Sequence, residues 1–282
     1  MSFDFEAITH GKWILAGEHA VIRGSGALVF PVTDKTIKLS YTRNLSPLKI
    51  RTNYINQNDT NINIVINKII NKACNILNEP FDDFTGEVYI ETNIPAGIGM
   101  GASAALCVAV ARWFEYLNFL QLDQIYNFAK NLEDIFHGKS SGLDIAGVST
   151  NSGVYFKQGV TNTIHSAWQP NWQLSSCNET SPTAECINKV KKLWDSNEKL
   201  AKALDLQMGQ SVEIAKMALE NKSLNSLAML QEAMQLANAC FEQWGLITPK
   251  LAEHMQQIKS AGALAVKPTG SGGGGLVVSL WE

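Results

Sequence analysis

Residues 94–106 read IPAGIGMGASAAL, with glycines at 97, 99 and 101. This stretch limits the folds that the chain can adopt more than any other. Because glycine loses more backbone freedom on folding than any other residue, this spacing indicates that the backbone must approach something closely. The preceding GEVYIETNIP alternates as a strand does, and 102–117 reads as a buried helix. A strand, a glycine turn and a helix N-terminus predict an anion cradle; a tight turn packed on a sheet is the alternative.

Two common nucleotide-binding motifs fail here. The dinucleotide pattern G-x-G-x-x-G is broken, because the three glycines are followed by Ala102 and Ala104. A Walker pattern is suggested by Gly138-Lys139-Ser140, but the position five residues before Gly138 is Glu133 instead of glycine. The sequence therefore supports neither a Rossmann enzyme nor a P-loop protein.

Composition narrows the class of protein. The 282 residues are 45% hydrophobic and 17% charged, as expected for a globular chain of one large or two ordinary domains. A net charge of −3 provides no basic field for nucleic acid. Five scattered cysteines without a C-x-x-C pair predict reduced thiols, with neither disulfides nor a zinc site. The N-terminal residues do not resemble a signal peptide and no apolar run approaches the length of a membrane span, so we expect a cytoplasmic protein without membrane partners.

The pattern along the chain predicts mixed helices and strands. We expect strands within 13–42, an exposed connection over 44–63, a helix over 62–78, a strand over 86–95, and helices over 102–117 and 123–136. A small-residue turn then opens a short helix near 144, a strand closes this half near 158, and 160–180 forms a linker or an edge strand. Helices dominate 184–260, with Gly245 as a left-handed cap and Thr248-Pro249 starting the last one. Two strands around a glycine turn end the chain. This predicts an α+β fold of two domains, 1–158 and 159–282.

Two further stretches carry candidate catalytic residues. GKWILAGEHAV places Lys12, Glu18 and His19 around one apolar strand, where they either face a cleft or form a surface lysine and a local turn. In NLEDIFHGKSSGLDIAG, Glu133 lies beside a helix stripe and Asp144 falls in the first turn of a new helix, as a functional acid or a simple capping acid. His137 follows Glu133 by four residues, but a lone histidine is more often structural than a metal ligand.

A fourth stretch, KPTGSGGGGLVV, has five glycines in six positions. It suits a tight hairpin or a second surface that presses on a ligand or on the first glycine loop.

Taken together, these stretches resemble the GHMP kinases, the family of galactose, homoserine, mevalonate and phosphomevalonate kinases. GKWILAGEHAV looks like the first motif of the family, PAGIGMGASAA like the second and KPTGSGGGG like the third. Within the family, Gly17-Glu18-His19-Ala20-Val21 and HGKSSGLD at 137–144 are most similar to the mevalonate kinase branch. The resemblance implies an N-terminal ribosomal protein S5 domain 2-like domain and a C-terminal ferredoxin-like domain with long helices.

The resemblance also assigns roles. ATP and Mg²⁺ would be the cofactors, and the γ-phosphate would pass to the C5 hydroxyl of mevalonate. Asp144 would accept the proton of that hydroxyl and Lys12 would stabilise the developing charge. Metal binding would fall to Ser103 and Glu133. The nucleotide-binding residues would be Pro95, Gly97, Gly99, Met100, Gly101, Ala102 and Ser103, and the acceptor would be held by Glu18, His19, Thr183 and Ser271.

Three departures from the family pattern concern the substrates. Ala102 and Ser271 stand where relatives commonly carry Ser and Ala, and Ser181-Pro182-Thr183 replaces the usual Arg-x-Thr. The missing basic residue could alter how an acidic acceptor is held. Another small hydroxyl compound, such as phosphomevalonate or a sugar, therefore stays open as the acceptor, as does a non-catalytic nucleotide-binding relative. The resemblance also allows a homodimer.

Overall fold

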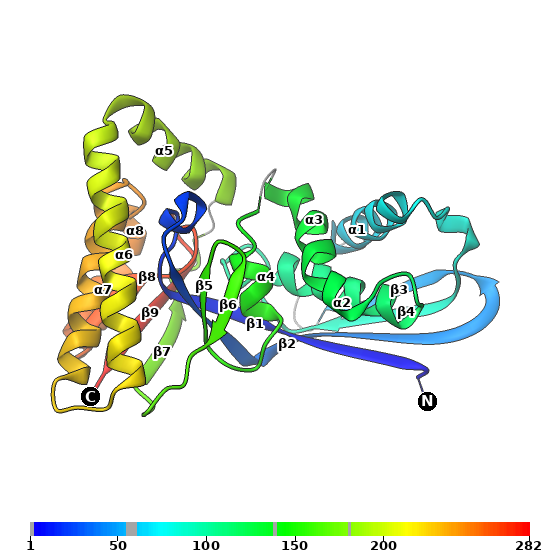
Figure 1. Cartoon of the computed structure of the whole chain (residues 1–282), viewed down its shortest axis with the longest axis horizontal. Coiled ribbons are helices and arrows are strands. Elements are labelled where there is room, and N and C mark those ends of the chain that lie inside the picture. Colours follow the sequence, from blue (N-terminus) through cyan, green and yellow to red (C-terminus); the bar gives the residue numbers. More distant parts are fainter. Residues whose placement is uncertain (1–2, 55–60, 138–139, 180–181) are drawn as a thin grey trace. The chain divides into compact units, whose positions relative to one another are not determined.

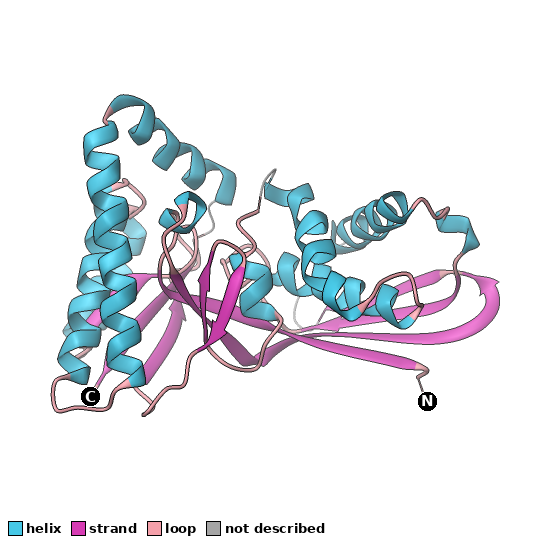
Figure 2. Cartoon of the chain, viewed as in Figure 1, coloured by secondary structure: helices cyan, strands magenta, loops and turns pink. Residues whose placement is uncertain are grey.

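The computed structural model describes residues 3–54, 61–137, 140–179 and 182–282, in which helices and strands are mixed (Figures 1 and 2). The strands are β1 (Phe5–Ala16), β2 (Ala27–Pro47), β3 (Lys49–Tyr54), β4 (Thr85–Thr92), β5 (Val154–Lys157), β6 (Val160–Thr163), β7 (Asn171–Ser176), β8 (Ala265–Pro268) and β9 (Leu276–Trp281). The helices are α1 (Asn61–Leu77), α2 (Ala102–Tyr116), α3 (Ile125–His137), α4 (Leu143–Val148), α5 (Thr183–Ser196), α6 (Glu198–Glu220), α7 (Ser226–Gln243) and α8 (Pro249–Ser260).

The chain forms two compact units, each built from several segments. Unit 1 comprises Met1–Gly11, Pro31–Ile94 and Gly101–Asn151, and unit 2 comprises Lys12–Phe30, Pro95–Met100 and Ser152–Glu282. The chain thus passes from unit 2 into unit 1 within the first glycine stretch. Segments that precede residue 158, such as Lys12–Phe30 and Pro95–Met100, therefore group with the C-terminal half. The predicted boundary between two domains at residue 158 stays a prediction.

Unit 1 is a sheet covered by helices. The unit 1 part of β2 pairs antiparallel with β4, with Leu39 opposite Ile90, and β3 runs parallel to β4, with Ile50 opposite Val88. Alternate residues of β4 are buried, as expected for a strand with one covered face. Against this face lies α2, whose Trp113 ring is 5.5 Å from that of Tyr41 on β2. The predicted helix over 102–117 is confirmed, with almost every residue from 104 to 114 buried.

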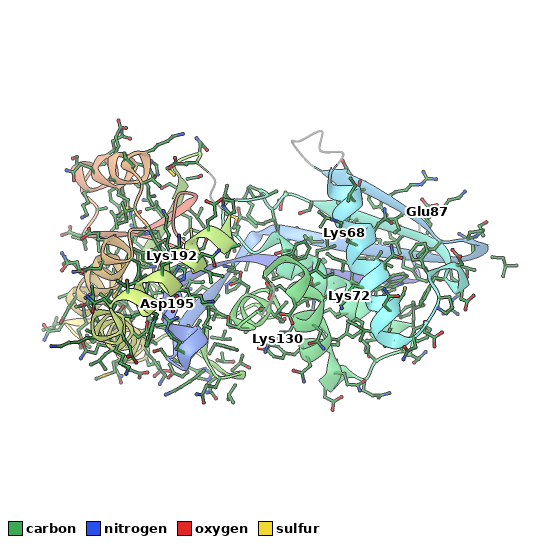
Figure 3. All side chains as sticks on the ribbon, turned by 90° about the horizontal axis from the view of Figure 1, so that it is seen from above. Lys68, Lys72, Glu87, Lys130, Lys192 and Asp195 are labelled. Carbon is green, nitrogen blue, oxygen red and sulfur yellow. The ribbon has the colours of Figure 1, made fainter. Side chains whose placement is uncertain are left out.

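The predicted amphipathic helix over 62–78 is also confirmed as α1. Ile66, Ile69 and Ile70 on its inner face are fully buried, whereas Lys68 and Lys72 lie on its exposed face (Figure 3). Spacing of three and four residues puts the isoleucines on one side of a helix, and this periodic pattern was sufficient to predict the helix from the sequence.

Unit 2 contains a three-stranded antiparallel sheet in the order β7-β9-β8 and the long helices of the C-terminal half. Leu251 and Met255 of α8 pack on Val266 and Val277 of this sheet, while α6 and α7 lie side by side (Figure 1). The predicted start of α8 is confirmed, because the Thr248 side chain accepts a hydrogen bond from the Leu251 amide and Pro249 is the first helical residue.

The exposed connection expected over 44–63 is wrong for most of its length. Strand β2 continues to Pro47, β3 follows, and α1 begins at Asn61; residues 55–60 lie outside the described residues. Edge strand β3 has one partner, β4, and its polar, solvent-facing composition resembles that of a loop. For 160–180, the edge-strand alternative is confirmed, since β6 and β7 each lie at the edge of a sheet.

None of the helices in the described part of the chain is long and apolar enough to span a membrane. All five cysteines are buried thiols.

Candidate active site

Two glycine-rich loops of unit 2 pack against each other through their backbones. Gly97 and Gly99 in the first loop have φ angles of 76° and 86°, in the left-handed region. A Cβ on Gly275 in the second loop would lie 2.8 Å from the carbonyl oxygen of Ile98, and one on Gly270 would lie 3.5 Å from that of Gly99. The second glycine stretch therefore fits two of the alternatives left open: it connects the antiparallel strands β8 and β9 as a hairpin, and it packs on the first glycine loop. Ala96 and Gly97 remain exposed, which leaves backbone amides of the first loop open to a ligand.

Strand β1 joins both loops. The Lys12 amide donates to the Met100 carbonyl at 2.9 Å, and the Ile14 amide donates to the Thr269 hydroxyl at 2.7 Å. Lys12 is only 2% exposed, so the surface-lysine alternative is wrong. Its backbone lies beside the first glycine loop, and its ammonium is close enough to Glu18 to lower the pKa of that carboxyl.

Glu18 lies two residues after the end of β1 and is also only 2% exposed. Its Oε1 lies 2.5 Å from Nζ of Lys267, which stands at the start of the second glycine stretch and has no exposed surface. Burial raises the pKa of Glu18. The positive charges of Lys267 and Lys12 act in the opposite direction and offset only part of this rise. Each charge is thus buried with a partner of opposite sign, as buried charges require.

His19 has a left-handed backbone, with φ of 58°, and a buried side chain. Its Nε2 lies 2.9 Å from the carbonyl oxygen of Ser271. A carbonyl only accepts, so Nε2 carries the proton. The imidazole packs edge-on against Phe241 and Trp244, with ring centroids 6.2 and 5.2 Å away. Burial lowers the pKa of His19 to about 4, so the ring is neutral at pH 7.

Ser271 and Thr183, the other two predicted acceptor residues, also belong to unit 2. Ser271 contributes its carbonyl to His19 and is half-buried. Thr183 is the first residue of α5, and Cys186, three residues later, has its Sγ 3.2 Å from the Gly272 carbonyl. The start of α5 therefore lies beside the second glycine loop. Ser181 of the departing motif lies outside the described residues.

Unit 1 holds the other predicted catalytic groups. Gly101, with φ of 77°, is the N-cap of α2 and provides no side-chain cap, and Ala102 and Ser103 form the first turn. The amides of such a turn point outward along the helix axis and favour anions. Ser103 is half-buried in this first turn.

Glu133 on α3 is 1% exposed, and its Oε2 accepts a hydrogen bond from the Ser140 hydroxyl. Glu133 helps to raise the pKa of Cys107 on α2, although burial of the thiol is the larger cause, so the carboxylate lies close to that helix. Cys107 is one turn after Ser103 on the same face. Hydroxyl and carboxylate oxygens, such as those of Ser103 and Glu133, are of the type that Mg²⁺ prefers, and this ion takes few protein ligands with the rest from water and phosphate.

A site made of side chains alone is not present: no cluster of three or more His, Cys, Asp or Glu residues that could hold a metal occurs within the described ranges. The side chain of His137 and residues 138 and 139 lie outside them, so the pairing of Glu133 with His137 stays untested.

Asp144 lies in the first turn of α4 and is half-buried. Several contacts fix this short helix. The Tyr126 hydroxyl donates to the Gly142 carbonyl at 3.2 Å, and a Cβ on Gly142 would lie 2.1 Å from that hydroxyl oxygen. Burial, and secondarily the charge of Glu133, raise the pKa of Tyr126 to about 12, so the hydroxyl stays a donor.

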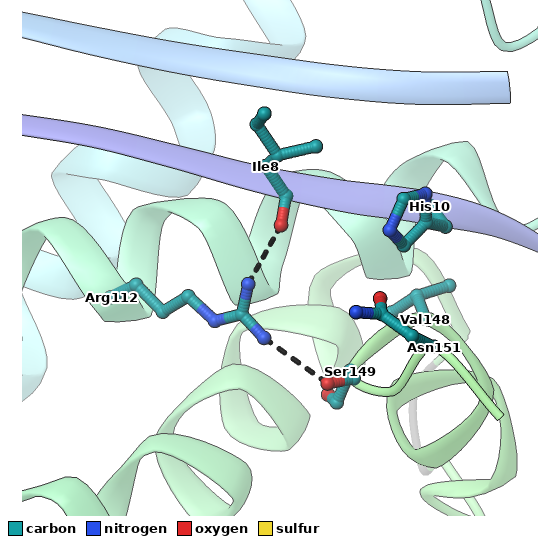
Figure 4. A pocket seen from close by; sticks show the side chains of 6 residues that line it. All are labelled: Ile8, His10, Arg112, Val148, Ser149 and Asn151. Atoms are coloured by element: carbon teal, nitrogen blue, oxygen red, sulfur yellow. Dashed lines mark hydrogen bonds between the residues drawn. The ribbon is translucent and has the colours of Figure 1, made fainter. Parts of the chain in front are cut away.

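The other end of α4 is held by Arg112. The guanidinium donates to the carbonyls of Ile8 on β1 and Ser149 at the end of α4, at 2.7 and 3.1 Å (Figure 4). A cation at a helix C-terminus is favourable. A pocket of about 350 Å³ opens beside this contact, lined by Ile8, His10, Arg112, Val148, Ser149 and Asn151. It contains none of the predicted site residues, so we assign it no part in the chemistry.

Three residues that contribute contacts are not predicted by the sequence motifs: Lys267, Ser140 and Arg112. Lys267 and Ser140 stand inside the stretches KPTGSGGGG and HGKSSGLD, where glycines, Ser271 and Asp144 are the predicted site residues. A lysine inside the apolar strand AVKP was a signal for a buried ion pair. Arg112 carried no signal, because both of its partners are backbone carbonyls.

Comparison with known proteins identifies the family. Residues 65–152 match the model of the GHMP kinases N terminal domain and residues 215–281 that of the GHMP kinases C terminal, together more than half of the chain. A mevalonate kinase from Pyrococcus horikoshii is 28% identical over 289 residues, covering 95% of this chain and 86% of the relative.

Two solved structures show the fold. An L. major mevalonate kinase in complex with R-mevalonate matches with a TM-score of 0.80 at 23% identity, covering 98% of this chain and 86% of that one. A Streptococcus pneumoniae phosphomevalonate kinase in complex with phosphomevalonate and AMPPNP matches with a TM-score of 0.78 at 15% identity, covering 98% and 92%. With its three motifs, its two matched domains and its mixed α+β fold, this chain belongs to the GHMP kinase family.

Proposed function

We propose that the protein is an ATP- and Mg²⁺-dependent kinase that transfers the γ-phosphate of ATP to the C5 hydroxyl of mevalonate. The observation that carries this proposal is the Glu18–His19 pair. Both residues are buried against the second glycine loop of unit 2, and the form Gly-Glu-His-Ala-Val resembles the mevalonate kinase branch. The relative from Pyrococcus horikoshii supports the same acceptor.

Phosphoryl transfer requires positioning, charge neutralisation and an activated hydroxyl. Bound ATP would supply the phosphoryl group and Mg²⁺ would neutralise its charge. The amides of Gly97, Gly99 and Gly101 and of the first turn of α2 would hold phosphate oxygens. Ser103 and Glu133 would provide oxygen ligands for the metal. Pro95, Met100 and Ala102 shape the loop through their backbones.

The remaining residues act on the acceptor. Asp144 takes the proton of the attacking hydroxyl, and Lys12 stabilises the charge that develops on the transferred group. Glu18, His19, Thr183 and Ser271 bind the polar groups of the acceptor. Because Ala102 has no hydroxyl, backbone amides and Ser103 hold the phosphates.

A second candidate is a GHMP kinase with another acceptor. The likeness to a phosphomevalonate kinase favours it, since one fold serves both acceptors. The absence of a basic residue from Ser181-Pro182-Thr183 argues against an acceptor with an added phosphate in that corner. A non-catalytic relative is the weaker alternative, because a pure nucleotide binder has no need of Asp144 and Lys12.

An ADP-release assay tests the proposal. We would incubate the protein with Mg-ATP and, separately, mevalonate, phosphomevalonate, galactose and homoserine, and we expect turnover with mevalonate. Asp144→Asn should lower kcat by about 10²–10⁴-fold, the usual contribution of a positioned base. The exposed Asp195→Asn on α5 is the control and should retain full activity. Turnover on none of the four acceptors would contradict the proposal.

Location and assembly belong to the same proposal. Buried thiols in all five cysteines support a cytoplasmic location. The family resemblance allows a homodimer, and sedimentation equilibrium would distinguish it from a monomer.

A further inference from the structure

Lys267 is the most deeply buried charge of unit 2 that has no role in the chemistry above. Its side chain has no exposed surface, and Nζ lies 2.5 Å from Oε1 of Glu18, 3.3 Å from the Ile14 carbonyl and 5.3 Å from the ring centroid of Phe241. Taking an ammonium out of water is costly, and one salt bridge at this depth seldom repays that cost. The arrangement therefore calls for a reason other than stability.

The other carboxylate oxygen of Glu18 suggests that reason. Oε2 is buried and accepts no hydrogen bond from any residue in the described ranges. Buried carboxylate oxygens are nearly always hydrogen-bonded, so an acceptor at this depth without a donor is a place for a ligand donor. A hydroxyl group suits it, whereas a second anion would be repelled.

The neighbours of Glu18 decide whether it stays ionised. Burial alone favours the protonated acid, and Lys267 is the larger of the two cationic influences that oppose it, ahead of Lys12. A protonated Glu18 could donate a hydrogen bond but would accept one poorly. Without Lys267, the carboxylate would lose the partner that orients it, and the pKa of Glu18 would rise further.

We propose that Lys267 is a positioning residue: its ammonium holds Glu18 as an oriented carboxylate whose Oε2 accepts a hydrogen bond from a hydroxyl of the phosphoryl acceptor. The inference rests on the proposed function, and it adds a requirement that the acceptor bring a hydroxyl donor to this point. Lys267 itself touches neither acceptor nor nucleotide.

Steady-state kinetics of Lys267→Met tests this role. The KM for the acceptor should rise by about 10- to 100-fold, the loss expected for a hydrogen bond to a charged group, while the KM for ATP changes less than about threefold. The acid limb of the kcat/KM profile should move to higher pH, because Glu18 now ionises with greater difficulty. Lys267→Arg keeps the charge and should recover part of the loss. Lys202→Met, which removes an exposed ion pair on α6, is the control.

The outcomes separate the possible failures. Wild-type protein without turnover on any acceptor contradicts the proposed function. Active wild type with a folded Lys267→Met of unchanged acceptor KM and pH profile contradicts the positioning role. If Lys267→Met does not fold, the double variant Glu18→Gln/Lys267→Met carries no unpaired buried charge and provides the test. Its acceptor KM should equal that of Glu18→Gln, and a clearly larger loss would show that Lys267 acts by another route.

Discussion

At the scale of single residues, His19 combines two costs that the fold has to offset. Its backbone is left-handed, which is uncommon for a residue with a side chain, and its imidazole is held neutral by burial. Arg23 and Asp205, an ion pair joining the turn after β1 to α6, exert opposite and smaller influences on its pKa. Strain of this kind concentrates at functional sites, in agreement with the acceptor role proposed for His19.

The buried imidazole predicts a pH dependence of stability. The pKa of His19 falls from 6.5 to about 4 on folding, so below pH 6.5 the unfolded chain binds a proton that the folded protein refuses. The contribution of neutral His19 to the free energy of unfolding is therefore complete above pH 6.5. This contribution decreases by about 3 kcal/mol as the pH falls to 4.

Urea unfolding of wild type and His19→Gln between pH 7 and 4 measures this effect. The difference between the two curves removes the contributions of other groups, including Glu18, and should shrink steadily below pH 6.5. A constant difference would show that His19 titrates normally in the folded protein.

Candidate site residues can be found from sequence where they stand close together in a motif. Lys12, Glu18 and His19 share one short motif and the structure buries all three, while their roles stay predictions. Lys267 escaped because its partner Glu18 lies 249 residues away in the chain, a distance across which no local pattern acts.

At the scale of elements, the two glycine loops of unit 2 form one backbone contact. Gly275 has a φ of 80°, and a side chain there would collide with the Ile98 carbonyl. Helices with strong 3.6-residue periodicity, such as α1 and α2, were predicted with ends within about one residue. Strand β3 was missed because its Asn-rich neighbourhood and its single-partner edge position leave almost no apolar alternation to detect.

Gly275→Ala should separate this contact from ordinary glycine strain. Gly159, in the turn between β5 and β6, has a similar φ of 84° with nothing within 4 Å of a Cβ. Both alanine variants incur the left-handed penalty of about 1–2 kcal/mol. Only Gly275→Ala should also displace the Pro95–Met100 loop, with a further loss of stability and a raised KM for ATP. Equal unfolding free energies and equal KM values in the two variants would contradict the packing role.

At the scale of the whole molecule, the fold class followed from the sequence but the compact units did not. Alternation of helix and strand patterns predicted two α+β domains, and the family fold agrees. The units, however, assemble segments such as Lys12–Phe30 and Pro95–Met100 with the C-terminal half. Such long-range grouping depends on which buried surfaces match, and one-dimensional patterns contain little information on that.

The proposed activity depends on which oxygen of mevalonate receives the phosphate. Proton-coupled ³¹P NMR of the product formed from mevalonate and Mg-ATP identifies the phosphorylated oxygen. Transfer to the primary C5 hydroxyl gives a phosphomonoester signal split into a triplet by the adjacent CH₂ protons, alongside the signals of ADP, and this is the result we predict. A new phosphoester signal without that splitting would contradict the proposed transfer to the C5 hydroxyl. ATP signals that stay unchanged after incubation with the folded protein would contradict the proposed mevalonate kinase activity.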